Sequence, residues 1–179
     1  MDQLFYVRKL VVSALCVALC VVLPIAFHMI PGGGSLFSPM HIPVLLCGLV
    51  CGWPYGILCG AVGPLLSSLL TSMPLMAYLP GMMVELVAYG FVAGVLMKIV
   101  HTGQLHKDVY ISLIVAMLAG RVVAGFAQAL IFRVGDYGIS LWLGSYFVGT
   151  WPGLIVQLIL IPVIIFALEK AGLVMRGNK

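Results

Sequence analysis

Charged side chains are scarce in this sequence. They make up 8% of the 179 residues, whereas hydrophobic residues make up 63%, and the mean hydropathy is +1.22. Ordinary soluble domains carry about 25% charged residues, so this composition excludes a soluble globular domain. A bilayer core needs roughly 20 apolar residues per helical span, so the length allows about five to seven spans. We therefore expect an all-α integral membrane protein that forms a single transmembrane domain.

The sequence also lacks the motifs of several catalytic and cofactor-binding classes. No glycine-rich loop ending in Lys-Ser or Lys-Thr occurs, which excludes that type of nucleotide site. Five cysteines lie inside apolar segments, where buried thiols are favoured over disulfides, and an odd number cannot pair completely. No His or carboxylate stands near them in sequence to complete a metal site. We expect neither a metal nor a cofactor. The cysteines are Cys16, Cys20, Cys47, Cys51 and Cys59.

Long apolar runs are what the sequence has in abundance, and they divide into six predicted spans. These cover about residues 10–29, 41–51, 54–71, 78–99, 109–132 and 146–168. The second span is too short to cross a bilayer untilted. Helices interrupted by Gly and Pro need cover from neighbouring protein, so we expect the second and third spans to be shielded by longer helices.

The few charges are distributed unevenly between the connections. With six spans, most cations fall on one side, whereas the opposite side holds only Arg133 and Asp136. The positive-inside rule then places both termini in the cytoplasm. The cations on the first side are Arg8, Lys9, Lys98, Lys107, Lys170, Arg176 and Lys179.

Residues 31–43, PGGGSLFSPMHIP, connect the first two spans on the predicted outer side. Three consecutive glycines and three prolines do not favour a continued helix. The apolar residues in this loop nevertheless indicate that it packs against the protein. Two interpretations are open, a lid over a ligand site and a connection lying on the membrane surface.

Polar side chains inside the spans are concentrated in the second half of the chain. Glu85 and Arg121 are the charged residues placed well inside, at a cost of at least ~2.5 kcal/mol each on insertion scales. With a rise of ~1.5 Å per residue, Glu85 and Gln128 lie roughly 10 Å from the outer ends of their spans, and Arg121 and Gln157 roughly 18 to 20 Å. Two levels of polar groups therefore descend from the outer face.

These groups could bind a small polar molecule. Arg121 could bind a carboxylate, a phosphate or a ring acceptor, and Glu85 an amine, a ring N–H or a hydroxyl. His41 could reach the same ligand or cap the second span. Aromatic walls could come from Tyr78, Tyr89, Trp142, Tyr146 and Trp151. The structural alternative is a Glu85–Arg121 ion pair that only joins the fourth and fifth spans.

Six short motifs follow one another along nearly the whole chain. They are Ala14-x-x-x-Ala18, Ser38–Pro43, Gly52–Pro54, Glu85–Gly90, Gly120–Gly125 and Trp151–Gln157. Their order, together with six spans and cytoplasmic termini, resembles the substrate-binding S components of energy-coupling factor (ECF) transporters. Members of that family are small bacterial membrane proteins for vitamin uptake.

The resemblance implies a six-helix vitamin binder in the bacterial cell membrane, and not an enzyme. It would dock onto one membrane scaffold subunit and two ATPase subunits, with Ala14 and Ala18 facing the scaffold. The first loop would be the gate, and the outer halves of spans four to six would supply the other ligand contacts. The gate residues implied are Gly32, Gly33, Gly34, Phe37 and Met40.

The identity of the ligand is left open by the sequence. One buried acid, one buried base, aromatics and paired amides favour a flat heteroaromatic vitamin of the pyridine or pyrimidine type. A carboxylate such as pantothenate on Arg121 is the alternative. Two further classes stay open: a membrane-embedded enzyme using Ser67 or Ser68 with His41, and a ligand-free membrane scaffold.

Overall fold

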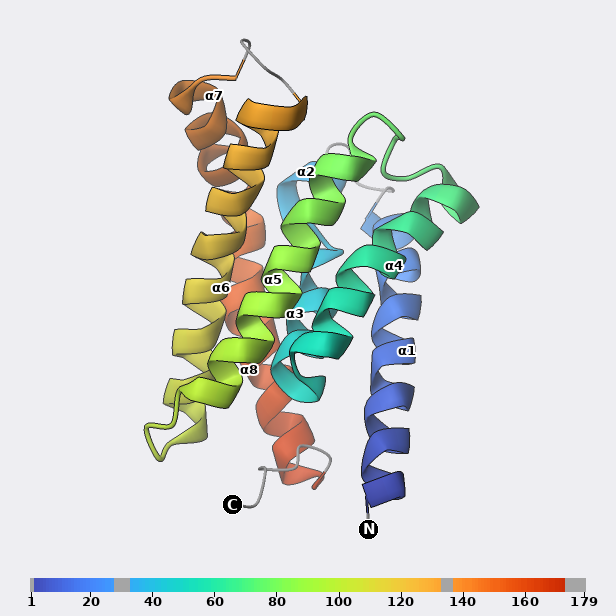
Figure 1. Cartoon of the computed structure of the whole chain (residues 1–179), viewed down its shortest axis with the longest axis vertical. Helices are drawn as coiled ribbons and strands as arrows, with labels where there is room; N and C mark the ends of the chain where they lie inside the picture. Colours follow the sequence, from blue (N-terminus) through green and yellow to red (C-terminus); the bar gives the residue numbers. More distant parts are fainter. Residues whose placement is uncertain (1, 28–32, 133–136, 173–179) are drawn as a thin grey trace.

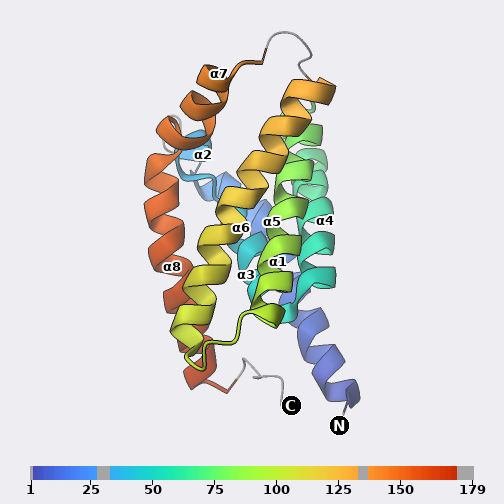
Figure 2. The same ribbon diagram turned by 60° about the vertical axis from the view of Figure 1, so that its left-hand side comes forward.

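Helices account for all the regular structure in residues 2–27, 33–132 and 137–172, the parts of the chain that the computed structural model describes. Five of these helices are long and apolar enough to cross a membrane. They are α1 (Asp2–Phe27), α4 (Trp53–Thr71), α5 (Leu79–Ile99), α6 (Leu105–Ala127) and α8 (Trp151–Lys170). Figures 1 and 2 show them running roughly side by side.

The short helix α3 (His41–Cys51) lies at the centre of the bundle (Figure 1). It packs against α1, α4, α5, α6 and α8, and every residue of it except Val50 is buried. Eleven residues extend about 16 Å, roughly half of a hydrocarbon core of ~30 Å. The described residues thus contain five long helices and this short one, whose bounds are those predicted for the second span. Longer helices shield α3, as predicted for the second span. The third span, α4, instead exposes one face, which includes Leu58, Leu69 and Leu70.

Glycines allow α3, α4 and α5 to approach closely. A Cβ added to Gly90 would overlap the backbone of Gly56, and one added to Gly48 would lie 2.6 Å from the Gly90 carbonyl oxygen. A Cβ on Gly60 would lie 2.6 Å from the Leu86 carbonyl oxygen. Packing of this kind drives helix association in lipid, where no hydrophobic effect acts between helices.

Two predicted boundaries are wrong. The loop predicted at 31–43 contains a short helix, α2 (Gly33–Phe37), whereas α3 begins at residue 41 as predicted for the second span; residues 31 and 32 lie outside the described part. The glycines form a helical turn because α2 packs against α1 and α8. The last long helix begins at Trp151, because Pro152 in its first turn needs no hydrogen-bond acceptor. Residues 144–148, at the predicted start of that span, form a separate π-helical turn, η2 (Gly144–Val148).

The two ends of the bundle differ in charge. The start of α1, the α5–α6 connection and the end of α8 lie at one end, and α2 and α7 (Ile139–Leu143) lie at the other (Figure 1). The first end carries basic residues on four helices: Arg8 and Lys9 on α1, Lys98 on α5, Lys107 on α6 and Lys170 on α8. Arg133 and Asp136 lie outside the described residues.

Candidate ligand-binding site

A buried polar cluster joins the start of α3 to the middle of α5. His41 Nε2 lies 3.2 Å from Glu85 Oε1, and the Tyr89 hydroxyl donates to the same oxygen at 2.9 Å. Glu85 and Tyr89 meet because they stand four residues apart on one helix. His41 Nδ1 lies 3.2 Å from the carbonyl oxygen of Ser38, just before α3. All three side chains are buried, so this cluster supplies the partners that an intramembrane carboxyl needs.

Arg121 on α6 is buried without an acidic partner. Within the described ranges His41–Glu85 is the one ion pair, so the predicted alternative of a Glu85–Arg121 pair is wrong. The Arg121 side chain is 2% exposed, and its Nε has no hydrogen-bond partner. Its Cζ lies 5.5 Å from the centroid of the Phe147 ring. Such a contact is worth about 0.5–2 kcal/mol, but it leaves the Nε–H unsatisfied.

Gln157 on α8 supplies a second unsatisfied buried donor. It is 1% exposed, and its Nε2 has no hydrogen-bond partner. Leaving a buried donor unpaired costs about 1–3 kcal/mol, so both donors are suited to an acceptor that arrives from outside the chain. They stand on α6 and α8, which pack against each other. The sequence predicts that Arg121 and Gln157 lie at the same depth below the outer ends of their spans.

Aromatic side chains from α7 and η2 cover Arg121. Trp142 Nε1 donates to the Arg121 carbonyl oxygen at 3.0 Å, and the Trp142 and Phe147 rings meet edge to face with centroids 5.4 Å apart. Tyr146, in the same η2 turn, lies near Gln128. The Gln128 amide in turn lies against Gly81 of α5. Trp142, Tyr146 and Gln128 thus form one outer layer.

Two glycines of one predicted motif, Gly120–Gly125, make room for this arrangement. A Cβ at Gly120 would overlap the Tyr89 ring, and one at Gly125 would lie 2.5 Å from Trp142 Nε1. Any other residue at these positions would displace the aromatic side chain that packs there. The motif Gly120–Gly125 therefore positions two of the predicted site residues as well as carrying Arg121.

The predicted gate residues pack against two helices. A Cβ at Gly153 of α8 would lie 2.8 Å from the carbonyl oxygens of both Leu36 and Phe37, so α2 rests on that glycine. The Phe37 ring lies 5.3 Å from the Phe27 ring of α1. Met40 is 2% exposed, and its carbonyl oxygen lies 3.9 Å from Cys20 Sγ. Gly33 is buried and Gly34 half-buried, whereas Gly32 lies outside the described residues.

Trp151 does not join this group. It is 58% exposed at the start of α8, so its side chain faces away from the buried polar residues. The sequence predicts it as one of several aromatic walls of the site. In the structure Tyr146 belongs to the separate η2 turn, whereas Trp151 begins α8.

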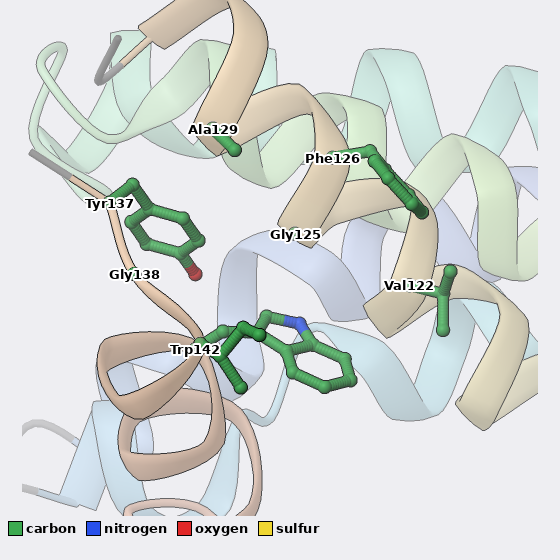
Figure 3. A pocket seen from close by; sticks show the side chains of 8 residues that line it. Val122, Gly125, Phe126, Ala129, Tyr137, Gly138 and Trp142 are labelled. Atoms are coloured by element: carbon green, nitrogen blue, oxygen red, sulfur yellow. The ribbon is translucent and has the colours of Figure 1, made fainter. Parts of the chain in front are cut away.

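An apolar cavity of about 320 Å³ lies between α6 and α7 (Figure 3). Val122 and Phe126 line it from α6, and Trp142 lines it from α7. It shares only Trp142 with the predicted site residues, and Phe126 is 63% exposed. The cavity therefore opens on the surface of the bundle, and neither Glu85 nor Arg121 lines it. The remaining lining residues are Gly125, Ala129, Tyr137, Gly138 and Ile139.

The serine–histidine arrangement of the alternative membrane-embedded enzyme is not formed. Ser68 Oγ donates to the Pro74 carbonyl oxygen at 2.8 Å, and Ser67 Oγ lies 3.5 Å from the Thr71 hydroxyl. Both His41 ring nitrogens are engaged elsewhere, by Glu85 and the Ser38 carbonyl. A hydroxyl nucleophile needs a base within hydrogen-bond reach, and neither serine has His41 in that position.

Two residues of the site were missed. Phe147 follows Tyr146 directly, so the aromatic pair was a usable signal for a second ring above Arg121. Ser38 contributes its carbonyl oxygen, and no side-chain pattern reveals a backbone contact of that kind. It has a positive φ of 44°, which ends α2 and turns the chain toward α3.

The predicted partner-docking residues lie on an exposed face of α1. Ala14 and Ala18 are both exposed. Large apolar neighbours on the same helix are exposed as well, among them Leu15 at 60% and Val22 at 56%. Small residues at such a spacing permit close approach of another helix in lipid.

Buried polar groups beneath an aromatic layer, inside a bundle of apolar helices, define a membrane protein suited to binding a small polar molecule. A family model described as "ECF transporter, substrate-specific component" matches residues 8–175. The chain belongs to this family, and is thus a multi-pass membrane protein of substrate transport. Comparisons with curated proteins and with solved structures give no match.

Proposed function

We propose that the chain is the S component that binds a small water-soluble vitamin or vitamin precursor for uptake across the bacterial cell membrane. The observation that carries this proposal is that two of the buried polar atoms without a hydrogen-bond partner, Arg121 Nε and Gln157 Nε2, stand on the neighbouring helices α6 and α8. Sites for small molecules combine apolar walls with a few placed polar groups. The chain acts by binding and not by catalysis.

The proposed topology has six membrane-embedded helices, with α3 as a short one enclosed by the other five. Both termini lie in the cytoplasm in this arrangement. The supporting observation is the basic end of the bundle, formed by the start of α1, the α5–α6 connection and the end of α8. Cytoplasmic connections carry an excess of Lys and Arg. The ligand then enters from the opposite end, past α2 and α7.

The proposed partners are one ECF membrane scaffold subunit and two ATPase subunits, whose ATP hydrolysis supplies the energy. The exposed face of α1 around Ala14 and Ala18 is the proposed docking surface for the scaffold. Residues 33–40, here called the gate segment, close the site from outside. Packing of α2 on Gly153 supports this role, because it gives the segment a defined seat on α8.

A flat heteroaromatic ligand of the pyridine or pyrimidine type fits the aromatic side chains around Arg121. Trp142 and Tyr146 belong to the layer above it, and Tyr89 packs on Gly120 next to it in sequence. A carboxylate such as pantothenate is the second proposal, favoured by the absence of an acidic partner for Arg121 among the described residues. Both proposals use the same buried donors.

Native mass spectrometry of the detergent-purified chain tests this function. The protein is measured alone and with a mixed panel of water-soluble vitamins, and one adduct of defined mass is expected. Arg121→Gln should lose the adduct, whereas the control Arg8→Gln, at an exposed position on α1, should keep it. Folded protein that gives no adduct with any panel member contradicts the proposal. Equal adducts in both variants would show that Arg121 is not part of the site.

A further inference from the structure

The His41–Glu85 pair carries no net charge in this geometry. The Ser38 carbonyl can only accept a hydrogen bond, so His41 Nδ1 must carry a proton to bond it at 3.2 Å. Nε2 and Glu85 Oε1, 3.2 Å apart, then need one further proton between them. Whether that proton is on nitrogen or on oxygen, the imidazole and the carboxyl together sum to zero.

Arg121 therefore contributes one positive charge that nothing described in the chain balances. Glu85, the acid of the neighbouring cluster, is already neutralised by His41. The other acids with described side chains are engaged elsewhere or lie at a helix end: Asp108 accepts from Thr102, and Glu169 is exposed at the end of α8. Intramembrane charges are rare, and they pair with another group or face a cavity or pathway.

Resting on the proposed function, we infer that the ligand carries a carboxylate, which the Arg121 guanidinium and the Gln157 amide bind. One negative charge balances Arg121, and a carboxylate presents the acceptors that Arg121 Nε and Gln157 Nε2 lack. A phosphate monoester is disfavoured because its charge of about −1.5 to −2 exceeds the single positive charge available. The charges of the described residues also disfavour a cationic ligand, since it would add a second positive charge beside Arg121.

The carboxylate could stand on a heteroaromatic ring or on an acyclic chain, and matched pairs of probes separate these cases. The acids are nicotinate, pantothenate and biotin. Their partners without the charge are nicotinamide, pantothenol and biotin methyl ester, and thiamine and pyridoxine are included as ligands without a carboxylate. Binding of each probe to the full-length protein in detergent is measured by isothermal titration.

One acid is expected to bind at least about 30-fold tighter than its uncharged partner, because removing one member of a buried charge pair has an effect of that size. In Arg121→Gln the acid should lose this advantage. Arg121→Lys keeps the charge without the planar fork, so the acid should bind more weakly than to the natural chain and still better than its partner.

Two results would overturn the inference. One is tight binding of thiamine, pyridoxine or an uncharged partner in preference to every acid, which would leave the proposed function standing. The other is an acid preference that survives in correctly folded Arg121→Gln, which would place the carboxylate elsewhere. A folded protein that binds no vitamin would overturn the proposed function itself, and the inference with it.

Discussion

Gly120→Ala is expected to destabilise the bundle and disrupt the polar cluster. The new methyl group would overlap Cδ1 and Cε1 of the Tyr89 ring, which is 1% exposed. Overpacking of this kind costs about 1–3 kcal/mol. Displacing the ring also breaks its 2.9 Å bond to Glu85 Oε1, worth about 0.5–1.5 kcal/mol or more.

The sum, about 2–4 kcal/mol, corresponds to a fall in Tm of roughly 5–15 °C for a chain of this size. Thermal unfolding in detergent measures it. The matched control is Gly144→Ala, where an added Cβ meets nothing within 4 Å and the backbone is helical. A second test is Gly120→Ala with Tyr89→Ala, which should cost less than the sum of the two single changes. A Gly120→Ala variant as stable as Gly144→Ala would refute the described packing.

Two further substitutions test the hydrogen bonds around the site. Tyr89→Phe removes a donor to Glu85 and should lower the free energy of unfolding by about 0.5–1.5 kcal/mol or more, whereas Tyr78→Phe, at a 57% exposed position, should change it by less than about 0.5 kcal/mol. Trp142→Phe removes the indole donor and should cost about 0.5–1.5 kcal/mol, whereas Trp151→Phe, at a 58% exposed position, should be near neutral. Equal losses within either pair, measured by thermal unfolding, would contradict the assigned contacts.

The helical membrane fold could be predicted from the sequence because each long span carries its own signal. Apolar runs of about 20 residues are a local property, and so is the interruption at Gly52 and Pro54. The boundary near Trp151 was also readable, since Pro152 is typical of a helix start. The turn at Gly33–Phe37 was not, because it depends on packing against α8 at Gly153.

The polar residues could be found from the sequence, but their partners could not. A charge inside an apolar run is visible locally, which is why Glu85 and Arg121 were identified. His41 and Glu85 are 44 residues apart, so their pairing follows from the crossing of α3 and α5. With Glu85 bonded to His41, the Arg121 guanidinium has no acidic partner among the described residues, which is the basis of its proposed role.

A cryo-EM structure of the protein with its vitamin bound, in complex with its partner subunits or an antibody fragment, is the most direct test of the central claim. The account predicts ligand density within hydrogen-bond distance of Arg121 and Gln157, beneath Trp142 and Phe147. Density in the apolar cavity between α6 and α7, with Arg121 paired to an acid of the chain itself, would contradict it.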